Sequence, residues 1–160
     1  MKHINGIIFT LYILLLGVGA GIIVALGAFT APVIFNASQL LSFEMDRFSS
    51  GLIMTEIFVR SNVYLNFIAF IIVVFEIYAY RYTTYRSKID LTLGTIAVTG
   101  IFSFTSYYTP LIIEAQKLGI EATTTDSFRD IHRYAEMDYT VVLLALIALV
   151  FHRIFKAVKL

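Results

Sequence analysis

The residues best suited to chemistry gather in the stretch FRDIHRYAEMDY, from Phe128 to Tyr139. It holds two arginines, two aspartates, a glutamate and a histidine, and it directly precedes the uncharged run TVVLLALIALVF. His132 and Glu136 are four residues apart, so they share one face of a helix. Imidazole and carboxylate groups bind divalent cations of the zinc, copper or manganese kind, and an imidazole also exchanges protons near neutral pH. The spacing predicts a metal or proton site at the mouth of an apolar helix.

A third ligand for this site is predicted from a similarity within the chain. Glu56 follows Phe48 by the same interval as Glu136 follows Phe128. We therefore expect Glu56 to approach His132 and Glu136 from a second helix. The further candidate ligands are Glu114 and Asp138. The alternative is a structural cluster of hydrogen bonds and ion pairs that ties two helix ends together.

More polar residues follow Glu56 along the same predicted helix. Glu56 and Arg60 have the spacing of an ion pair on one helix face. Asn62 and Asn66 lie one to two turns deeper, and amides inside a membrane need partners, so this face should look into a bundle. These side chains either line a polar path for a cation or proton, or they hold the helices together.

Two further ionisable groups lie in or beside apolar stretches. Glu76 is predicted to snorkel, or to pair with Arg81 or a residue of the C-terminal tail, with a proton relay as the alternative. A haem would need two axial histidines, and His3 and His152 are predicted at one membrane face. Because His3 lies in a terminus and His152 in the basic segment FHRIFK, we do not expect a haem. The cofactor that the pattern leaves open is a divalent metal.

Four long apolar stretches must position these residues. The chain has 160 residues, is 59% hydrophobic and has a mean hydropathy of +0.83, which exceeds what a soluble domain of this size buries. Each stretch reaches the roughly 20 residues that cross a bilayer as a helix. The stretches cover about 7–35, 50–80, 90–113 and 137–155. We expect one all-α domain over residues 1–160, an integral membrane four-helix bundle whose second and fourth helices extend beyond the membrane.

The ends of the stretches carry further signals. The first and third end alike, in FTAPVIFNASQL and YYTPLIIEAQKL, which suggests two tandem helical hairpins that arose by duplication and lie parallel. Pro32 and Pro110 should bend or end their helices, because proline cannot donate a helix hydrogen bond. Asp46 is the predicted start of the second helix, and Asp126 or Ser127 is the predicted cap of the fourth.

Charge predicts the orientation and excludes some functions. Basic residues dominate the loop between the second and third stretches and the C-terminal tail, while the other two loops are acidic overall. The positive-inside rule then places both termini in the cytoplasm of a bacterial-type inner membrane. A net charge of +1 gives no case for nucleic-acid binding, and the absence of cysteine excludes thiolate sites. No phosphate loop, nucleophile elbow or metalloprotease helix is present in the sequence, so we expect no catalytic residue and no enzyme.

Short motifs along most of the chain are similar to those of a known family. They are an Ala-Pro-x-x-Phe segment, a Phe-x-x-Gly element with a later Phe, and a Phe-x-x-x-His element, here Ala31, Pro32 and Phe35, then Phe48, Gly51 and Phe58, then Phe128 and His132. The chain resembles the small four-span family known as transmembrane-protein-205-like, or domain of unknown function 4149. The resemblance implies the four-span fold and places weight on Pro32, Phe128 and His132. A more distant resemblance to copper-handling four-span modules is weakened by the few histidines of this chain.

Two functions from different classes follow. In the first, a small cation, metal or proton engages Glu56, Arg60, His132 and Glu136 and is bound or transported. In the second, the chain is a non-catalytic assembly subunit that contacts membrane lipid and either a second copy or another membrane protein. A continuous polar path through Asn62, Asn66 and Glu76 would favour the first. A sealed bundle with an exposed ridge of small residues would favour the second, and the ridge consists of Gly17, Gly21, Ala25 and Ala28.

Overall fold

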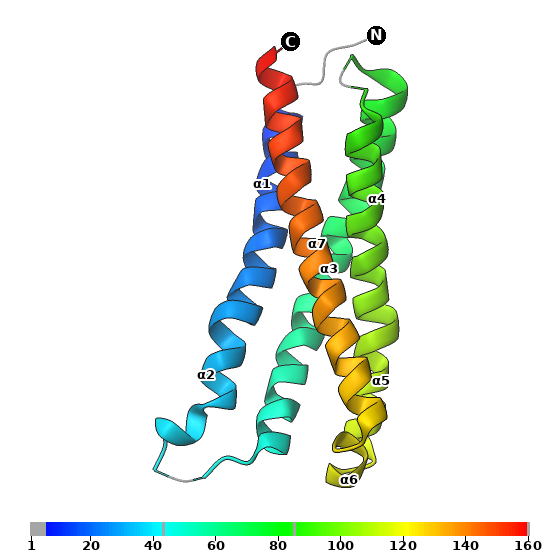
Figure 1. Cartoon of the computed structure of the whole chain (residues 1–160). Coiled ribbons are helices and arrows are strands. Elements are labelled where there is room, and N and C mark those ends of the chain that lie inside the picture. Colours follow the sequence, from blue (N-terminus) through cyan, green and yellow to red (C-terminus); the bar gives the residue numbers. More distant parts are fainter. Residues whose placement is uncertain (1–5, 43, 85, 160) are drawn as a thin grey trace.

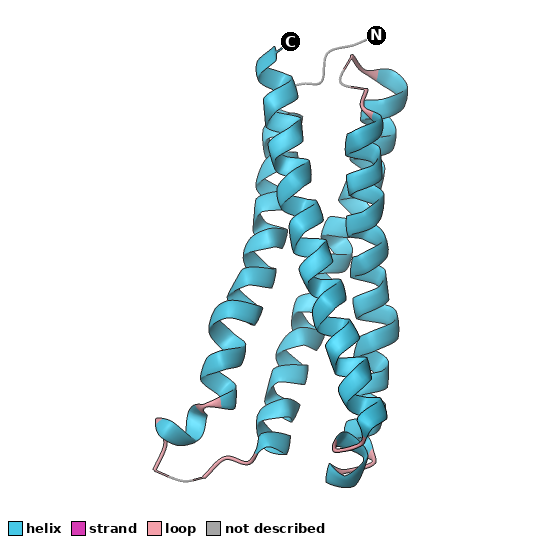
Figure 2. Ribbon diagram, viewed as in Figure 1, coloured by secondary structure: helices cyan, strands magenta, loops and turns pink. Residues whose placement is uncertain are grey.

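The computed structural model describes residues 6–42, 44–84 and 86–159, and within these ranges it contains helices and loops but no strand (Figures 1 and 2). The first span consists of α1 (Gly6–Val24), a π-helical segment η1 (Ala25–Thr30) and α2 (Ala31–Phe35), and a short 3-10 turn η2 (Ala37–Gln39) follows. The second span is the single helix α3 (Arg47–Tyr82). The third consists of α4 (Lys88–Ser103), a π-helical segment η3 (Phe104–Tyr108) and α5 (Thr109–Lys117). The short α6 (Ile120–Thr123) leads into α7 (Asp126–Lys159), which is the fourth span.

The four spans form a bundle of antiparallel neighbours. All four are long and apolar enough to cross a membrane, and each contains one of the stretches predicted from hydropathy. α1 packs on α3 and α7, and α4 also packs on α3 and α7, so the helices surround one core. The start of α1, the end of α7 and the α3–α4 loop share one end of the bundle (Figure 1). The expected all-α membrane bundle is confirmed.

We call the end that contains residues 81–84, 86–88 and 153–159 the basic end. The other end, which carries the α2–α3 and α5–α7 connections, is called the opposite end. Figure 1 shows that α2 leans away from α7 towards the opposite end, and α2 packs on α3 there. The basic end is therefore the more tightly gathered of the two.

The core runs along the inner faces of all four spans. Its aromatic members contact one another directly: Tyr12 stacks on Phe75 with ring centroids 3.6 Å apart, and Phe104 lies 4.5 Å from Tyr139. Lipid tails are as apolar as leucine, so burial of apolar surface does not drive association inside a membrane, and close packing must hold the helices together. The fully enclosed aliphatic residues include Leu16, Leu65, Ile72, Ile101, Leu146 and Leu149.

Two glycines let α4 approach its neighbours closely. A methyl group at Gly100 would collide with Val142 Cγ2 on α7 and would lie 3.2 Å from Asp138 Oδ1. At Gly94 it would lie 3.0 Å from Glu76 Cγ on α3. Small residues at such crossings allow two helix backbones to come near each other. Gly100 and Gly94 thus fix the distance of α4 from α7 and from α3.

α3 and α7 each begin before the apolar stretch that was predicted for their span. Asp46 precedes α3, and its carboxylate accepts a 2.6 Å hydrogen bond from the Ser49 backbone N–H. This bond holds the pKa of Asp46 below its ordinary value. For α7 the predicted cap was wrong by one or two residues: the Thr125 hydroxyl accepts the hydrogen bond from the Phe128 N–H. The Asp126 side chain instead pairs with Arg129.

Neither proline ends its span. In each case a π-helical segment precedes the proline, and α-helix resumes around it, at Ala31 in the first span and at Thr109 in the third. A threonine shortly before each proline donates its hydroxyl to a carbonyl five residues earlier. Thr30, two residues before Pro32, donates to Ala25 at 3.0 Å, and Thr109, directly before Pro110, donates to Phe104 at 2.8 Å. The two spans therefore share a local geometry as well as a sequence pattern, which supports the predicted repeat.

Candidate functional site

The predicted site at the opposite end is not assembled. His132 Nε2 lies 3.2 Å from Glu136 Oε1, as their spacing predicted, but both side chains face outward, with 47% and 68% of their surface exposed. Glu56 bonds instead to Arg60 on its own helix at 2.8 Å. Within the described ranges no three side chains among His, Cys, Asp and Glu are grouped so that they could hold a metal ion. Helix packing turns α7 so that Ala135 and Tyr139, rather than His132, face the core.

The other predicted ligands at this end also lie apart from His132. Glu114 is exposed on α5. Asp138 is half-buried, and its Oδ2 atom has no hydrogen-bond partner among the described residues. Neither residue joins His132, Glu136 and Glu56 into one group of possible metal ligands.

The two asparagines of α3 bind α5 and η3. Asn62 Nδ2 donates to Thr109 Oγ1 at 3.1 Å, and Thr105 Oγ1 donates to Asn66 Oδ1 at 2.9 Å. Thr105 lies within the π-helical segment η3, and Thr109 directly follows it. The predicted inward face of Asn62 and Asn66 is therefore confirmed, and both amides join the third span to the second.

A buried ion pair lies near the basic end. Glu76 on α3 is 2% exposed and Arg153 on α7 is 1% exposed. Arg153 Nε donates to Glu76 Oε1 at 3.1 Å, and Arg153 Nη2 donates to Glu76 Oε2. The Tyr12 hydroxyl on α1 donates to Glu76 Oε1 at 2.7 Å. Of the predicted partners of Glu76, the structure confirms the residue of the C-terminal tail, Arg153.

A second carboxylate extends this pair. Asp90 in the first turn of α4 is fully buried. His152 Nδ1 lies 2.5 Å from Asp90 Oδ1, and Arg153 Nη1 lies 3.2 Å from Asp90 Oδ2, at ion-pair distance but without hydrogen-bond geometry. His152 is the only one of these groups that reaches the surface, with 32% of its side chain exposed. We call Tyr12, Glu76, Asp90, His152 and Arg153 the buried cluster.

The charges of the buried cluster do not balance without a proton. Glu76 and Asp90 contribute two negative charges, and Arg153 contributes one positive charge. With a neutral imidazole the set carries −1, and with a protonated imidazole it is neutral. An uncompensated charge away from water is costly, because desolvation of an ion exceeds the gain from imperfect pairing. The cluster can thus gain one proton without leaving an excess of buried charge.

Most of this cluster was not predicted from the sequence. Glu76 was singled out because it interrupts an apolar run, but Asp90 reads as an ordinary acid at a helix start. Tyr12 reads as an interfacial aromatic. The pairs that make the cluster join residues 62 to 77 positions apart, and no local periodicity reports such contacts. The one available signal was that two acids and two basic groups all fall near the same predicted end of the spans.

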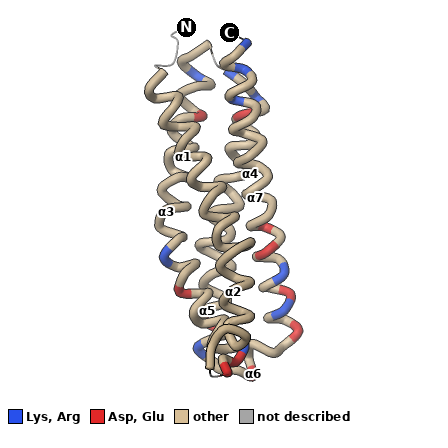
Figure 3. Tube along the Cα trace, turned by 90° about the vertical axis from the view of Figure 1, so that its left-hand side faces the viewer, with Lys and Arg blue, Asp and Glu red and all other residues tan. Residues whose placement is uncertain are grey.

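The middle of the bundle separates the buried cluster from the asparagines. Glu76 and Asn66 are ten residues apart on α3, which is about 15 Å along a helix. The core residues packed at this level are apolar, and Figure 3 shows an uncharged stretch between the charged parts of the two ends. The inward-facing residues at this level include Ile68, Ile72, Ala97, Ile101 and Leu146. The described part of the chain has no continuous polar path from end to end.

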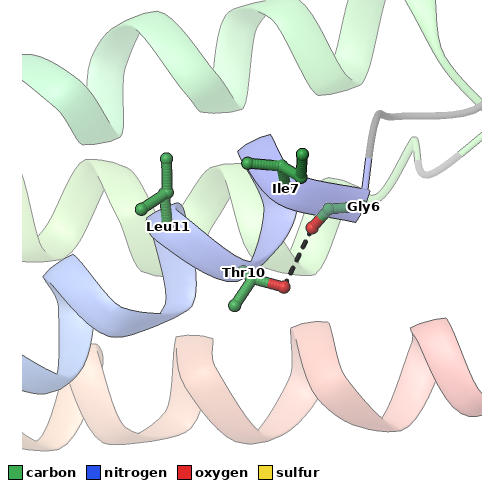
Figure 4. Close-up of a pocket in the computed structure, with 4 residues that line it drawn as sticks. All are labelled: Gly6, Ile7, Thr10 and Leu11. Atoms are coloured by element: carbon green, nitrogen blue, oxygen red, sulfur yellow. Dashed lines mark hydrogen bonds between the residues drawn. The ribbon is translucent and has the colours of Figure 1, made fainter.

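Two surface hollows accompany these features. One, of about 450 Å³, lies along a single face of α1 and is lined by Gly6, Ile7, Thr10 and Leu11 (Figure 4). Its one hydroxyl, that of Thr10, donates to the Gly6 carbonyl at 2.9 Å, so this hollow presents little polar chemistry. The other, of about 400 Å³, lies at the basic end and includes His152 in its wall. The buried cluster therefore borders a surface hollow through its imidazole.

Comparison with known proteins gives a family but no described activity. The sequence profile described as "Domain of unknown function (DUF4149)" matches residues 14–121, which is more than half of the chain. No curated protein matches the chain, and no solved structure matches it.

Proposed function

The chain belongs to the DUF4149 family of membrane proteins, and on that premise we propose that it binds a proton at its basic end through the buried cluster. It is an integral, multi-pass membrane protein with four spans. The proposed role is non-enzymatic. It retains the cation-or-proton class that the sequence suggested but assigns it to Asp90 and His152 rather than to His132 and Glu136.

The observation that carries the proposal is the charge of the buried cluster. Two buried carboxylates face one buried guanidinium, and the imidazole of His152 lies 2.5 Å from the second carboxylate. One proton on His152 completes a second ion pair and brings the cluster to neutrality. Histidine is suited to this role because its ordinary titration range spans physiological pH.

The proton has a short route from one side of the membrane only. His152 lines the hollow at the basic end and is partly exposed there. On the other side of the cluster lies the apolar middle of the bundle. We therefore propose a proton-binding protein that senses the compartment at its basic end, not a conductor of protons across the bilayer.

The pH dependence of stability tests this proposal. If the folded chain holds a proton that the unfolded chain has released, the free energy of unfolding falls as pH rises, by up to about 1.4 kcal/mol per pH unit. We expect such a fall in the wild-type chain. His152→Gln should abolish it, because glutamine cannot take up the proton. The measurement is thermal unfolding of the purified chain in detergent micelles at a series of pH values.

A matched control is available on the same helix. His132→Gln removes an exposed imidazole that pairs only with Glu136 at the opposite end, so it should leave the pH dependence intact. The charged or titratable groups around His152 include Asp90, Arg153, Lys156, Lys159 and Arg86. Asp90→Asn should also remove the slope, because Glu76 and Arg153 alone are already neutral. Equal slopes in wild type and His152→Gln would refute the proposal.

We further propose that the basic end faces the cytoplasm of a bacterial-type plasma membrane. The support is the distribution of charge: the sequence contains no acidic residue between Ile77 and Ile89 or between Tyr139 and Leu160, while both segments contain several basic ones. Basic residues are retained preferentially on the cytoplasmic side. In this orientation the buried cluster responds to cytoplasmic pH.

The sealed middle of the bundle favours a second candidate function, that of an assembly subunit. The ridge residues Gly17, Gly21, Ala25 and Ala28 are all exposed on the outer side of the first span. A proteoliposome assay with an internal pH-sensitive dye separates this candidate from transport. Protein-dependent proton or cation flux would exclude the assembly role and also the one-sided site proposed above.

A further inference from the structure

The hollow at the basic end has an unusual lining. Its volume is about 400 Å³, and it lies between the α3–α4 loop, the start of α4 and the end of α7. We call it the basic hollow. Its lining residues are Arg86, Ser87, Ile89, His152, Phe155, Lys156 and Lys159. None of these described residues is acidic.

The acids nearest to the basic hollow do not neutralise it. Glu76 and Asp90 are buried behind it and are already engaged by Arg153 and His152. Among the residues that the structure describes, no salt bridge joins Arg86, Lys156 or Lys159 to a carboxylate. Such an arrangement attracts an anion.

The cations of the basic hollow are held in place by neighbouring groups. Lys156 Nζ donates to the Arg86 backbone carbonyl, which joins α7 to the α3–α4 loop. The Arg86 guanidinium lies 4.5 Å from the centroid of the Tyr80 ring and donates one N–H to the Tyr80 hydroxyl at 3.1 Å. Lys159 Nζ lies 4.1 Å from the centroid of the Phe155 ring. A guanidinium has five donors, so Arg86 keeps several for an oxyanion such as a phosphate.

The remaining wall of the hollow is apolar and exposed. Ile89 and Phe155 have 57% and 60% of their surface accessible, and they lie at the basic end, in the first turn of α4 and near the end of α7. A free phosphate ion would gain nothing from this wall. A lipid would place its headgroup phosphate on the cations and its acyl chain along the wall. Basic pockets beside membrane spans are suited to anionic lipid headgroups.

We propose that the basic hollow binds the phosphate of an anionic phospholipid, with Arg86, Lys156 and Lys159 as the phosphate-binding residues. The acyl chain lies against Ile89 and Phe155. The proposal does not depend on the proton site, because Arg86 and Lys159 take no part in the buried cluster.

Native mass spectrometry of the full chain in detergent tests this site. The probes are dioleoylphosphatidylglycerol, dioleoylphosphatidylcholine and inorganic phosphate. We expect the anionic lipid to bind most tightly, and we expect Arg86→Gln with Lys159→Gln to weaken its binding by about tenfold or more, since each cation near a membrane surface contributes about fivefold. Both side chains are exposed, so the double variant should fold, which circular dichroism can confirm.

The control variant carries the same change of charge elsewhere. Lys117→Gln with Arg133→Gln removes two exposed cations at the opposite end and should leave lipid binding unchanged. Equal weakening in both double variants would show general electrostatic attraction and overturn the site. Equal binding of the two lipids would overturn the anionic preference. Binding of inorganic phosphate as tight as that of phosphatidylglycerol would show a phosphate site without a lipid component and would also overturn the proposal.

Discussion

Among single residues, Arg153 is the cation that is paired with the buried carboxylates. It lies within ion-pair distance of two carboxylates, Glu76 and Asp90, and is itself almost fully buried. Its Cζ atom also lies 5.5 Å from the centroid of the Phe75 ring. A buried ion pair adds little net stability compared with apolar packing, but removal of one partner leaves an uncompensated charge. Loss of Arg153 would therefore destabilise the fold, because it would leave two buried carboxylates without a compensating positive charge.

Arg153→Met should lower the free energy of unfolding by about 3–5 kcal/mol, because it leaves Glu76 and Asp90 without their cation. Arg60→Met is the matched control, since Arg60 belongs to an exposed ion pair with Glu56 whose loss costs under about 1 kcal/mol. Chemical unfolding in one detergent measures both. Addition of Glu76→Gln to Arg153→Met should recover part of the loss, and equal effects of the two single variants would contradict this account.

The residues predicted at the opposite end show why the spacing of residues along one helix did not predict which side chains meet in the bundle. The spacing of His132 and Glu136 correctly placed them beside each other, and the pairing of Glu56 with Arg60 was also within reach of the sequence. Which face a helix turns to its neighbours depends on packing over its whole length. One residue corresponds to about 100° of rotation, so a small difference in register moves a side chain from the core to the surface.

Among the elements, α4 is the helix that close packing constrains most. It reaches α7 through Gly100 and α3 through Gly94, where an added methyl group meets Val142 and Glu76. Val142 is β-branched and has little rotamer freedom in a helix, so it cannot easily move away. The crossing is set by backbone proximity and not by long side chains.

Gly100→Ala should lower the free energy of unfolding by about 1–3 kcal/mol, because the added methyl group overpacks the α4–α7 contact. Gly17→Ala is the control, since nothing lies within 4 Å of a Cβ at that position. The control should be neutral or more stable by up to about 1 kcal/mol, because alanine favours helix over glycine. Both values come from the same unfolding assay. A loss in Gly17→Ala as large as that in Gly100→Ala would refute the proposed role of the crossing.

At the scale of the whole molecule, hydropathy predicted the architecture well. Four apolar stretches became four spans, and Asp46 became the cap of α3. The arrangement of the four helices around a shared core, and with it the meeting of Asp90 with His152, could not be predicted in this way. Such contacts depend on which faces of distant helices meet, and many faces of this chain are equally apolar.

The two ends of the bundle give a direct test of orientation, helped by the lack of native cysteine. Arg86→Cys and Glu121→Cys introduce single thiols in the α3–α4 loop and in α6, which lie at different ends (Figure 1). In intact cells a membrane-impermeant maleimide should label Glu121→Cys, and Arg86→Cys only after the membrane is opened. The reverse pattern would invert the proposed orientation, and labelling of both in intact cells would contradict the bundle's span count.

The π-helical segments determine how the two parts of the first and third spans are rotated relative to each other. A π turn holds one residue more than the α turn it replaces, so η1 and η3 behave as single-residue insertions that the helix absorbs without breaking. Everything beyond the insertion is rotated by about 100° relative to a regular helix. Loss of one residue from η3 would swing Thr109 away from Asn62 and expose a different face of α5 to α3. Deletion of one residue from η1 or η3 would therefore rotate the part of the span nearer the opposite end. The part nearer the basic end, and with it the contacts of the buried cluster, would keep its position.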